Sequence, residues 1–422
     1  MLPVRSAWNL VDTMKNPMQS AMQNHPVSRM SSFMTVVIAS LIALVSVALA
    51  VPSVHAQTFT VLYTFTSEAQ GWQPEAAPII DAAGNLYGTT QYGGTAGGFG
   101  TVFRLDTTGH EQVLHSFAGE PDGEDPNSPL VADHSGNVYG NTLYGGAAGG
   151  YGTVFKLDHH GHLTLLHSFA SNPDGADPHG SLIADPQGNG YGTTQYGGAA
   201  GGYGTVFELN AQGQFTVLHS FAGTPDGEDP EAGLIRDAAG NLYGTTVYGG
   251  TAGGFGTVFK LDGIGKLALL HSFAGTPDGV NPYAGLAADS AGNAYGTTKY
   301  GGTAGGFGTV FKIDRMGRFT LLHSFAGTPD GENPVAAVVV DPAGNVYGTT
   351  YYGGTFGYGT VFKIDTTGQL TILHSFNASP DGANPTAGLT RDAAGNLYGV
   401  TSAGGDLSCG FFGCGVIFKV TP

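Results

Sequence analysis

The sequence predicts an all-β fold, a seven-bladed β-propeller of four-stranded antiparallel blades. Three observations predict it: one unit recurs seven times, each copy reads as four short strands, and the two ends of the chain are complementary fragments of a copy. Each copy has a Gly-Asn-x-Tyr-Gly segment, a glycine-rich aromatic link and a Gly-x-x-Phe segment. The closing phenylalanines lie 52, 52, 52, 52, 51 and 56 residues apart, at Phe103, Phe155, Phe207, Phe259, Phe311, Phe362 and Phe418.

The copy Pro230–Phe273 has four short runs separated by turn or glycine-rich segments, of which the first is apolar and the second is rich in Tyr and Thr, as is typical of strands. Asp237 and Gly240 lie where a tight turn joins the first two runs, because Asp can cap such a turn and Gly can adopt a positive φ. Val247–Phe255 is the glycine-rich link, and Gly263–Lys266 is a second tight turn. The expected strands are Ala232–Asp237, Asn241–Thr246, Gly256–Asp262 and Leu267–Phe273.

The strand count predicts a closed ring. The Gly-Asn segment occurs seven times, but a fourth strand follows a third strand only six times. The missing fourth strand lies at the front, at Thr58–Phe65, which ends 52 residues before Phe117. Its pairing with the last three strands completes a seventh blade and removes the open edges of a linear array. The alternative, an open β-solenoid, gives no reason for such complementary ends.

These segments resemble the GloVer tandem-repeat family, secreted bacterial proteins described as having a choice of anchor. The resemblance rests on Gly240–Thr246, Tyr248–Gly250, Gly256–Leu261 and Leu270–Phe273 with their copies, and it covers residues 58–422. It implies a β-propeller-like exported protein of unassigned activity. WD and kelch repeats have a recurrent tryptophan, whereas the repeat region here has only Trp72.

The repeat region is strongly acidic. The whole chain carries a net charge of −17 and its first 56 residues carry +2, so the remainder carries −19. This charge argues against binding to nucleic acid and to anionic membrane surfaces, both of which require Lys and Arg. It favours solubility, or alternatively cationic partners such as metal ions.

The N-terminal segment has the pattern of a secretory signal. Met34–Val51 is uncharged and almost wholly apolar, Arg29 precedes it, and Val54–Ala56 resembles a signal-peptidase site. We expect cleavage after Ala56, with an uncleaved membrane anchor as the alternative. Both place the repeats outside the cytoplasm, as a secreted, periplasmic or cell-surface protein. Residues 1–56 are therefore assigned to an extension with a signal peptide, and residues 57–422 to a propeller that does not insert into the membrane.

Two longer connections of each copy are expected on the same face of the propeller, because alternate connections of an up-and-down blade emerge at the same end. One is the glycine-rich aromatic link, and the other is a Pro-Asp-Gly loop that ends in Asp-Pro or Asn-Pro. Since function concentrates on loops held by a rigid frame, this face is the expected binding site.

The Pro-Asp-Gly loops supply the candidate binding residues. Oxygen ligands on a glycine-containing turn suit calcium, but the alternating Asp pattern of a calcium loop is absent, and Asp also commonly starts simple turns. The first copy has Trp72 and no acid there, which marks an asymmetric spot. The candidates are Asp122, Asp125, Asp174, Asp177, Asp226, Asp229, Asp278, Asp330, Asp381 and Trp72. No cofactor is required, although calcium is a possible one, and the metal ligands stay unassigned.

Aromatic and histidine side chains also recur. The aromatic link supplies a tyrosine per copy, which either packs between blades or stacks on sugar rings near the acids: Tyr92, Tyr144, Tyr196, Tyr248, Tyr300 and Tyr352. The fourth strand supplies six histidines: His115, His167, His219, His271, His323 and His374. We expect each to be hydrogen-bonded within its blade and not to bind metal, because the outer strands of neighbouring blades should lie far apart.

Cys409 and Cys414 are the only cysteines, and both lie in the last aromatic link, which is longer than the others. Two cysteines five residues apart in an exported chain predict a local disulfide. A pair of free thiols is the alternative.

The sequence favours a binding or scaffold propeller without enzymatic activity, with calcium or a carbohydrate as its ligand on the loop-rich face and a protein partner as a further possibility. The alternative is an enzyme, a lyase or a glycan-cleaving hydrolase, with its site at the axial mouth. An enzyme requires unrepeated polar residues that converge there. The candidates are Trp72, Glu75, His179, Glu231 and Arg391. A third possibility, a surface-structural protein, would self-associate without a ligand.

Overall fold

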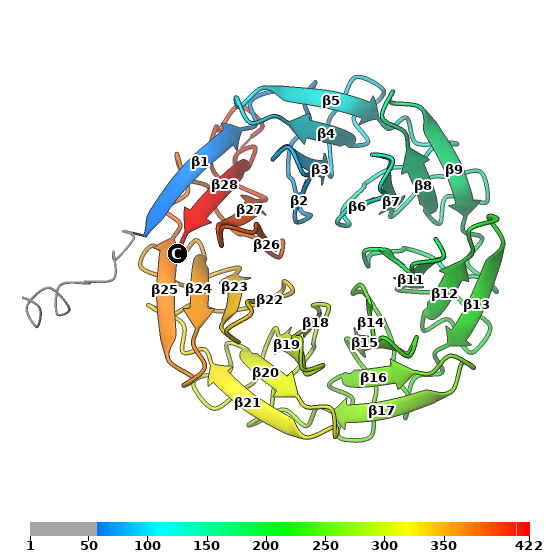
Figure 1. The fold of residues 1–422 in the computed structure, drawn as a ribbon, viewed down its shortest axis with the longest axis vertical. Helices are drawn as coiled ribbons and strands as arrows, with labels where there is room; N and C mark the ends of the chain where they lie inside the picture. The colour runs from blue at the N-terminus through cyan, green and yellow to red at the C-terminus, as the bar shows by residue number, and fades with distance from the viewer. Residues whose placement is uncertain (1–56, 411) are drawn as a thin grey trace, which may run out of the picture. The chain divides into compact units, whose positions relative to one another are not determined.

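The computed structural model describes residues 57–410 and 412–422, so the expected signal peptide lies outside the described residues. The described chain has no helix and forms seven separate four-stranded antiparallel sheets around a common axis (Figure 1). The prediction of a seven-bladed β-propeller is confirmed. None of the described segments is a helix long and apolar enough to cross a membrane.

Each blade runs from the axis outward in four positions. The innermost strands are β2 (Ile79–Ile80), β6 (Val131–Ala132), β10 (Ile183–Ala184), β14 (Ile235–Arg236), β18 (Ala287–Ala288), β22 (Val339–Val340) and β26 (Thr390–Arg391). The second strands are β3 (Leu86–Thr90), β7 (Val138–Thr142), β11 (Gly190–Thr194), β15 (Leu242–Thr246), β19 (Ala294–Thr298), β23 (Val346–Thr350) and β27 (Leu397–Thr401). The third strands are β4 (Thr101–Leu105), β8 (Thr153–Leu157), β12 (Thr205–Leu209), β16 (Thr257–Leu261), β20 (Thr309–Ile313), β24 (Thr360–Ile364) and β28 (Val416–Thr421). The outer strands are β5 (Glu111–Ser116), β9 (Leu163–Ser168), β13 (Phe215–Ser220), β17 (Leu267–Ser272), β21 (Phe319–Ser324), β25 (Leu370–Ser375) and β1 (Thr58–Thr64).

Blades 1 to 6 are continuous in sequence, from β2–β5 to β22–β25, and blade 7 joins the two ends of the chain. In blade 7, β1 pairs antiparallel with β28, from Thr58 opposite Thr421 to Thr64 opposite Val416. The predicted overlap of one strand with three is therefore present, and it leaves no linear array with open ends.

The innermost strands are shorter than expected. The run Ala232–Asp237 contributes only Ile235–Arg236 to its sheet. The carbonyl of Ala232 instead accepts a hydrogen bond of 2.9 Å from Oγ1 of Thr193 in the preceding blade. The start of this run therefore joins neighbouring blades and does not extend its own ladder.

The core lies between blades and repeats with the sequence. In every copy a buried phenylalanine that follows the outer strand meets the third-strand phenylalanine of the next blade edge to face, as Phe221 meets Phe259 at 5.2 Å. The glycine of the Tyr-Gly segment is required by this packing. A Cβ on Gly244 would lie 2.6 Å from the ring of Phe259.

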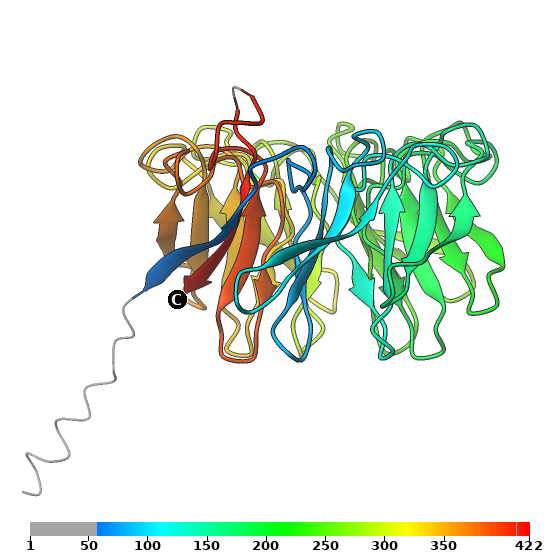
Figure 2. The ribbon, with the colours of Figure 1, turned by 90° about the horizontal axis from the view of Figure 1, so that it is seen from above.

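The first turn of each blade forms as predicted. Oδ1 of Asp237 accepts hydrogen bonds from the N–H groups of Ala239 and Asn241, and Oδ2 accepts from Nδ2 of Asn241 and the hydroxyl of Tyr243. Gly240 has a φ of 88°. This turn and the turn at Asp262–Lys266 define what we call the hairpin face, while the longer connections gather at the opposite, loop-rich face (Figure 2).

Candidate functional site

The two long connections of a copy lie side by side on the loop-rich face, as the sequence predicts. Glu228 in the Pro-Asp-Gly loop and Tyr248 in the aromatic link exchange backbone hydrogen bonds of 3.0 and 3.1 Å. The same bridge recurs in all seven copies, from Trp72 with Tyr92 to Ala383 with Ala403. This face therefore carries a repeated double layer of loops.

The first aspartate of each Pro-Asp-Gly loop is bound within its own blade. Its Oδ2 lies 2.8–3.1 Å from Nε2 of the outer-strand histidine, and its Oδ1 accepts the N–H of the residue four positions before it at 3.1–3.3 Å. Both carboxylate oxygens are thus engaged in closing the turn. The residues are Asp122, Asp174, Asp226, Asp278, Asp330 and Asp381.

One expectation about the histidines is wrong, namely that the outer strands of neighbouring blades lie far apart. Each is hydrogen-bonded within its blade, as expected, but outer strands of neighbouring blades are not far apart. Phe215 at the start of β13 stacks on His167 of β9 with ring centroids 3.8 Å apart, and Phe319 stacks on His271 at 4.2 Å. Neighbouring outer strands meet because each strand begins close to the point where the preceding one ends.

The second acid of the loop lies at the boundary between blades. Asp229 has a φ of 57°; its N–H donates to the carbonyl of Tyr203, and its carbonyl accepts from the N–H of Val247. The equivalent residues in blades 2 to 4 are Asp125, Asp177 and Asp229, and those in blades 5 to 7 are Asn281, Asn333 and Asn384.

The asparagines donate side-chain hydrogen bonds to backbone carbonyls across the blade boundary, which an ionised aspartate cannot do. Nδ2 of Asn281 donates to the carbonyl of Val247 at 2.9 Å, Nδ2 of Asn333 to that of Lys299 at 3.0 Å, and Nδ2 of Asn384 to that of Tyr351 at 3.1 Å. A carboxylate has no proton to donate at this position.

Burial raises the pKa of each of these three aspartates to about 6, since it disfavours the charged form. Asp125 and Asp229 are also close to the charges of Glu124 and Glu228, which raise the pKa further, while hydrogen bonds from the side chains of Gln91 and Gln195 lower it. These carboxyls are therefore costly to ionise, unlike ordinary surface carboxyls.

The seven copies differ from one another at the position two residues after the Asp229 position, in the segment that leads to the innermost strand. The residues there are Glu75, Asn127, His179, Glu231, Tyr283, Val335 and Thr386, which we call the axial rim. Burial raises the pKa of both Glu75 and Glu231 to about 7, and each is raised further by its neighbouring aspartate, Asp125 or Asp229. Burial lowers the pKa of His179 to about 4, so this side chain is neutral at pH 7.

Several rim side chains have specific partners. Nε2 of Gln195 donates to Oε1 of Glu231 at 2.7 Å, and Asn127 lies with Nδ2 3.2 Å from Nδ1 of His179. Lys299 lies over the ring of Tyr283 at 4.6 Å, and its charge lowers the pKa of Glu231 against the effect of burial. Gln195 and Lys299 both occupy the position directly after the second strand, which also differs among the copies. Neither residue was among the candidates predicted from the sequence. The sequence feature that could have identified them is that this position varies within a segment that is otherwise repeated.

Tyrosines lie between the acids. Burial raises the pKa of the phenols of Tyr92, Tyr144 and Tyr196, and nearby carboxylates raise it further. The carboxylates are Asp125 and Glu75 for Tyr92, Asp177 and Asp125 for Tyr144, and Asp229, Glu231 and Asp177 for Tyr196. Tyr144 and Tyr196 are 41% and 43% exposed. We call the five carboxyls Glu75, Asp125, Asp177, Asp229 and Glu231 the acidic arc, which spans blades 1 to 4.

Two further candidates differ in their position, since Trp72 lies beside Tyr92, the first tyrosine along the acidic arc, and Arg391 lies apart from the arc. Trp72 packs against Tyr92, with ring centroids 4.9 Å apart, and contacts the core beside blade 7. Arg391 belongs to β26 and directly precedes the Asp392 turn, so it lies at the hairpin face. The expectation that Arg391 converges on the mouth with Glu75, His179 and Glu231 is wrong, because its place at the end of the strand directs it to the opposite end of the blade.

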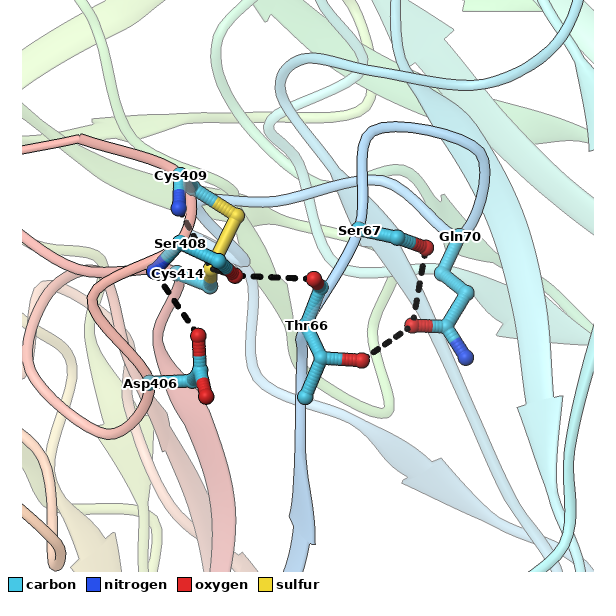
Figure 3. The surroundings of a disulfide bond; sticks show 7 residues. All are labelled: Thr66, Ser67, Gln70, Asp406, Ser408, Cys409 and Cys414. Carbon is cyan, nitrogen blue, oxygen red and sulfur yellow. Dashed lines mark hydrogen bonds between the residues drawn. A yellow bond between two sulfur atoms is a disulfide. The ribbon is translucent and has the colours of Figure 1, made fainter.

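The predicted disulfide joins Cys409 and Cys414 in the last aromatic link. The Oγ of Ser408 donates to the carbonyl of Thr66 at 2.8 Å, so this loop is tied to the segment that follows β1 (Figure 3). The described part of the chain contains no group of three or more His, Cys, Asp or Glu side chains placed to hold a metal ion.

The comparisons with known proteins show a family and a fold. The family model for the Gloeobacter/Verrucomicrobia repeat matches residues 51–255 and 198–413. A comparison with curated proteins gives no match. Virginiamycin B lyase from Staphylococcus aureus, in its selenomethionine-substituted form, is similar in structure with a TM-score of 0.57 and 12% identity, over 87% of this chain and 99% of the lyase.

A second similar structure is the extracellular domain assigned to a one-component system, BT4673, from B. thetaiotaomicron. Its TM-score is 0.53 at 9% identity, over 85% of this chain and 39% of that one. At such identities the likeness shows the fold alone. The repeat match covers nearly all of the propeller, and the chain therefore belongs to the Gloeobacter/Verrucomicrobia repeat family.

Proposed function

We propose that this protein is an exported binding or scaffold propeller that holds a carbohydrate, neutral or bearing amino groups, against the acidic arc of its loop-rich face. The observation that carries the proposal is the exchange of asparagine for aspartate at equivalent blade boundaries. Blades 5 to 7 have the asparagine that joins neighbouring blades, while blades 2 to 4 have Asp125, Asp177 and Asp229.

These aspartates lack the donor that joins blades elsewhere, and this supports a functional role for them. When ionised, none of them can donate the hydrogen bond that Asn281 makes, and each is partly buried with a raised pKa. Asp125 and Asp229 instead accept a hydrogen bond from the side chains of Gln91 and Gln195, whereas burial alone acts on Asp177. Residues that break a local rule without a structural gain are expected at functional sites. Asp226, three residues before Asp229, has the opposite character, because its carboxylate is satisfied by the blade itself.

The neighbouring tyrosines favour a sugar as the ligand. Tyr144 and Tyr196 leave about two-fifths of their surface exposed beside these carboxyls. An aromatic face packs on the apolar face of a sugar ring, and carboxyl oxygens accept hydrogen bonds from its hydroxyls. The net charge of −19 in the repeat region repels acidic polysaccharides, which leaves neutral and amino sugars as the favoured classes.

Export is part of the proposal. The disulfide Cys409–Cys414 is typical of proteins outside the cytoplasm, and one structural neighbour is an extracellular domain. The apolar N-terminal run with its basic flank supplies the third argument, from the sequence alone.

A second candidate is a glycan-cleaving hydrolase or lyase at the axial rim. The observation that favours it is that glutamate occupies only two of the seven equivalent positions, at Glu75 and Glu231, and that both have a pKa of about 7. Carboxyls with such values can act as general acids near neutral pH. This candidate predicts cleavage of a bound glycan, which Glu231→Gln would abolish without preventing binding.

The test is calorimetric titration of the purified protein with chitosan oligomers, neutral cello-oligosaccharides and oligogalacturonate, each with calcium or with chelator. The proposal predicts binding of a cationic or neutral oligomer, no binding of the anionic one, and loss of binding on Tyr196→Ala. Ile264→Ala, an exposed position on the hairpin face, is the matched control. A dependence on calcium would assign the carboxyls to a metal-bridged ligand. Absence of binding by all three oligomers would contradict the carbohydrate proposal.

A further inference from the structure

A cavity of about 690 Å³ opens at the hairpin face between blades 2 and 3, away from the acidic arc. Its walls are mainly apolar, with Val131, Tyr139 and Leu166 from blade 2 and Leu182 and Leu209 from blade 3. Small-molecule sites in proteins have volumes of roughly 300–1,000 Å³ and apolar walls with few polar groups.

The cavity coincides with a departure of blade 3 from the repeat at a position that is buried in the other blades. The first residue of the second strand is apolar and buried in six blades: Leu86, Val138, Leu242, Ala294, Val346 and Leu397. In blade 3 it is Gly190, which lies opposite Leu209 and lines the cavity. Leu209 is 6% exposed, while its equivalents Leu157 and Leu261 are fully buried.

The backbone does not require this glycine. Gly190 is not among the glycines with a positive φ, and a Cβ built on it meets only the carbonyl oxygen of Leu209, at an ordinary 3.8 Å. The glycine of the Tyr-Gly segment differs, since a Cβ on Gly192 would lie 2.6 Å from Phe207. Gly190 therefore leaves space that a larger side chain fills in the other blades.

The polar groups at the rim of the cavity favour an uncharged ligand. Asp133 and Asp185 are each saturated by four hydrogen bonds from their own turns. Lys156 lies over the ring of Tyr139 at 5.7 Å. The positive charge of Lys156 is outweighed by the two carboxylates, so an anionic ligand would gain little binding energy here. A cationic ligand is not favoured either, because the turns already occupy the hydrogen-bonding positions of both carboxylates.

From this we infer that Gly190 opens a second binding site, which takes one small, uncharged, largely apolar molecule, aromatic or alicyclic, between blades 2 and 3. The site is independent of the carbohydrate proposal, because it lies on the opposite face and shares no residue with the acidic arc.

The test is fluorescence titration of the full chain with N-phenyl-1-naphthylamine, a neutral apolar dye. The wild-type protein should bind one equivalent with a blue-shifted emission. Gly190→Leu should weaken binding at least about tenfold while its Tm stays equal or rises, since the added side chain occupies the cavity. Ala294→Leu adds the same side chain at the equivalent place in blade 5, and it should leave dye binding unchanged.

If Gly190→Leu does not fold, Leu166→Trp provides a second variant, because it narrows the cavity from the wall formed by blade 2. It too should weaken dye binding about tenfold. The inference is overturned if the wild-type protein shows no saturable binding. It is equally overturned if a folded Gly190→Leu or Leu166→Trp variant binds the dye as tightly as the wild type.

Discussion

Gln195 donates a hydrogen bond of 2.7 Å to Glu231 across the boundary between blades 3 and 4. Both residues occupy positions that differ among the seven copies, yet they contact each other at the axial rim. We predict that Gln195→Ala weakens carbohydrate binding about five- to tenfold, because Glu231 loses the group that orients it. Unfolding free energy should change by only about 1 kcal/mol. Calorimetric titration and chemical denaturation measure the two effects, and an unaltered affinity would exclude Gln195 as a positioning residue.

Asp226 and Asp229 lie in one loop but should respond oppositely to substitution. Asp226→Ala removes the acceptor for His219 and for the N–H of Ala222, so we expect a loss of about 1–3 kcal/mol in unfolding free energy. Asp229→Asn supplies the donor that Asn281 uses in the next blade, so we expect a gain of about 1 kcal/mol. Urea denaturation of both variants measures the difference, and equal effects of the same sign would contradict these roles.

Glu75 should make the protein less stable as the pH rises. Its folded pKa is about 7, above the ordinary value of 4.5, so the folded state binds this proton more tightly than the unfolded state does. The stability that Glu75 contributes is therefore present below about pH 4.5 and is lost as the pH rises to about 7.

Glu75→Gln removes this dependence. The Tm of the variant minus that of the wild type should be larger at pH 8 than at pH 5, by about 1–3 °C. Glu332→Gln, on the same face, is the control, since Glu332 belongs to a loop outside the arc. A Tm difference that does not change between the two pH values would show that Glu75 ionises as freely as a surface carboxyl.

Closure of the ring should depend on Phe59 of β1. Its ring stacks on His374 at 3.6 Å and lies 5.7 Å from Phe376, so it joins blade 7 to blade 6. Phe59→Ala should cost about 2–4 kcal/mol and promote aggregation, because β28 would expose its edge when β1 detaches. Thr60→Ala, at the neighbouring exposed position, should change little. Thermal melting with light scattering measures both, and equal melts for the two variants would contradict closure through Phe59.

The fold could be predicted almost completely, because each copy repeats the residues that form it. The Phe221–Phe259 contact and the Asp237 turn recur through the ring, so errors in one copy are corrected by the others. The innermost strand was predicted too long, since the bond from Thr193 to the carbonyl of Ala232 joins neighbouring blades, and residue alternation within one strand does not reveal it. The contact between neighbouring outer strands, as between His167 and Phe215, was missed for the same reason.

The site could be predicted only in outline. The loop-rich face follows from strand order, but the separate roles of Asp226 and Asp229 depend on which donors surround each carboxyl. Some informative residues were not recognised because the prediction rested on what the copies share. Gln195, Lys299 and Gly190 stand out only when one copy is compared with the others. Arg391 was misplaced although it directly precedes Asp392, which starts a tight turn that was recognised from the sequence in other copies.

The most direct test of the account is carbohydrate titration of the triple variant Asp125→Asn, Asp177→Asn, Asp229→Asn, together with its thermal melt. We predict a higher Tm, because three blade boundaries gain the hydrogen bond of Asn281, and a loss of affinity of at least about tenfold for the oligosaccharide that the wild type binds. A variant that binds as tightly as the wild type, whatever its Tm, would show that these aspartates are not retained for a ligand and would contradict the central claim.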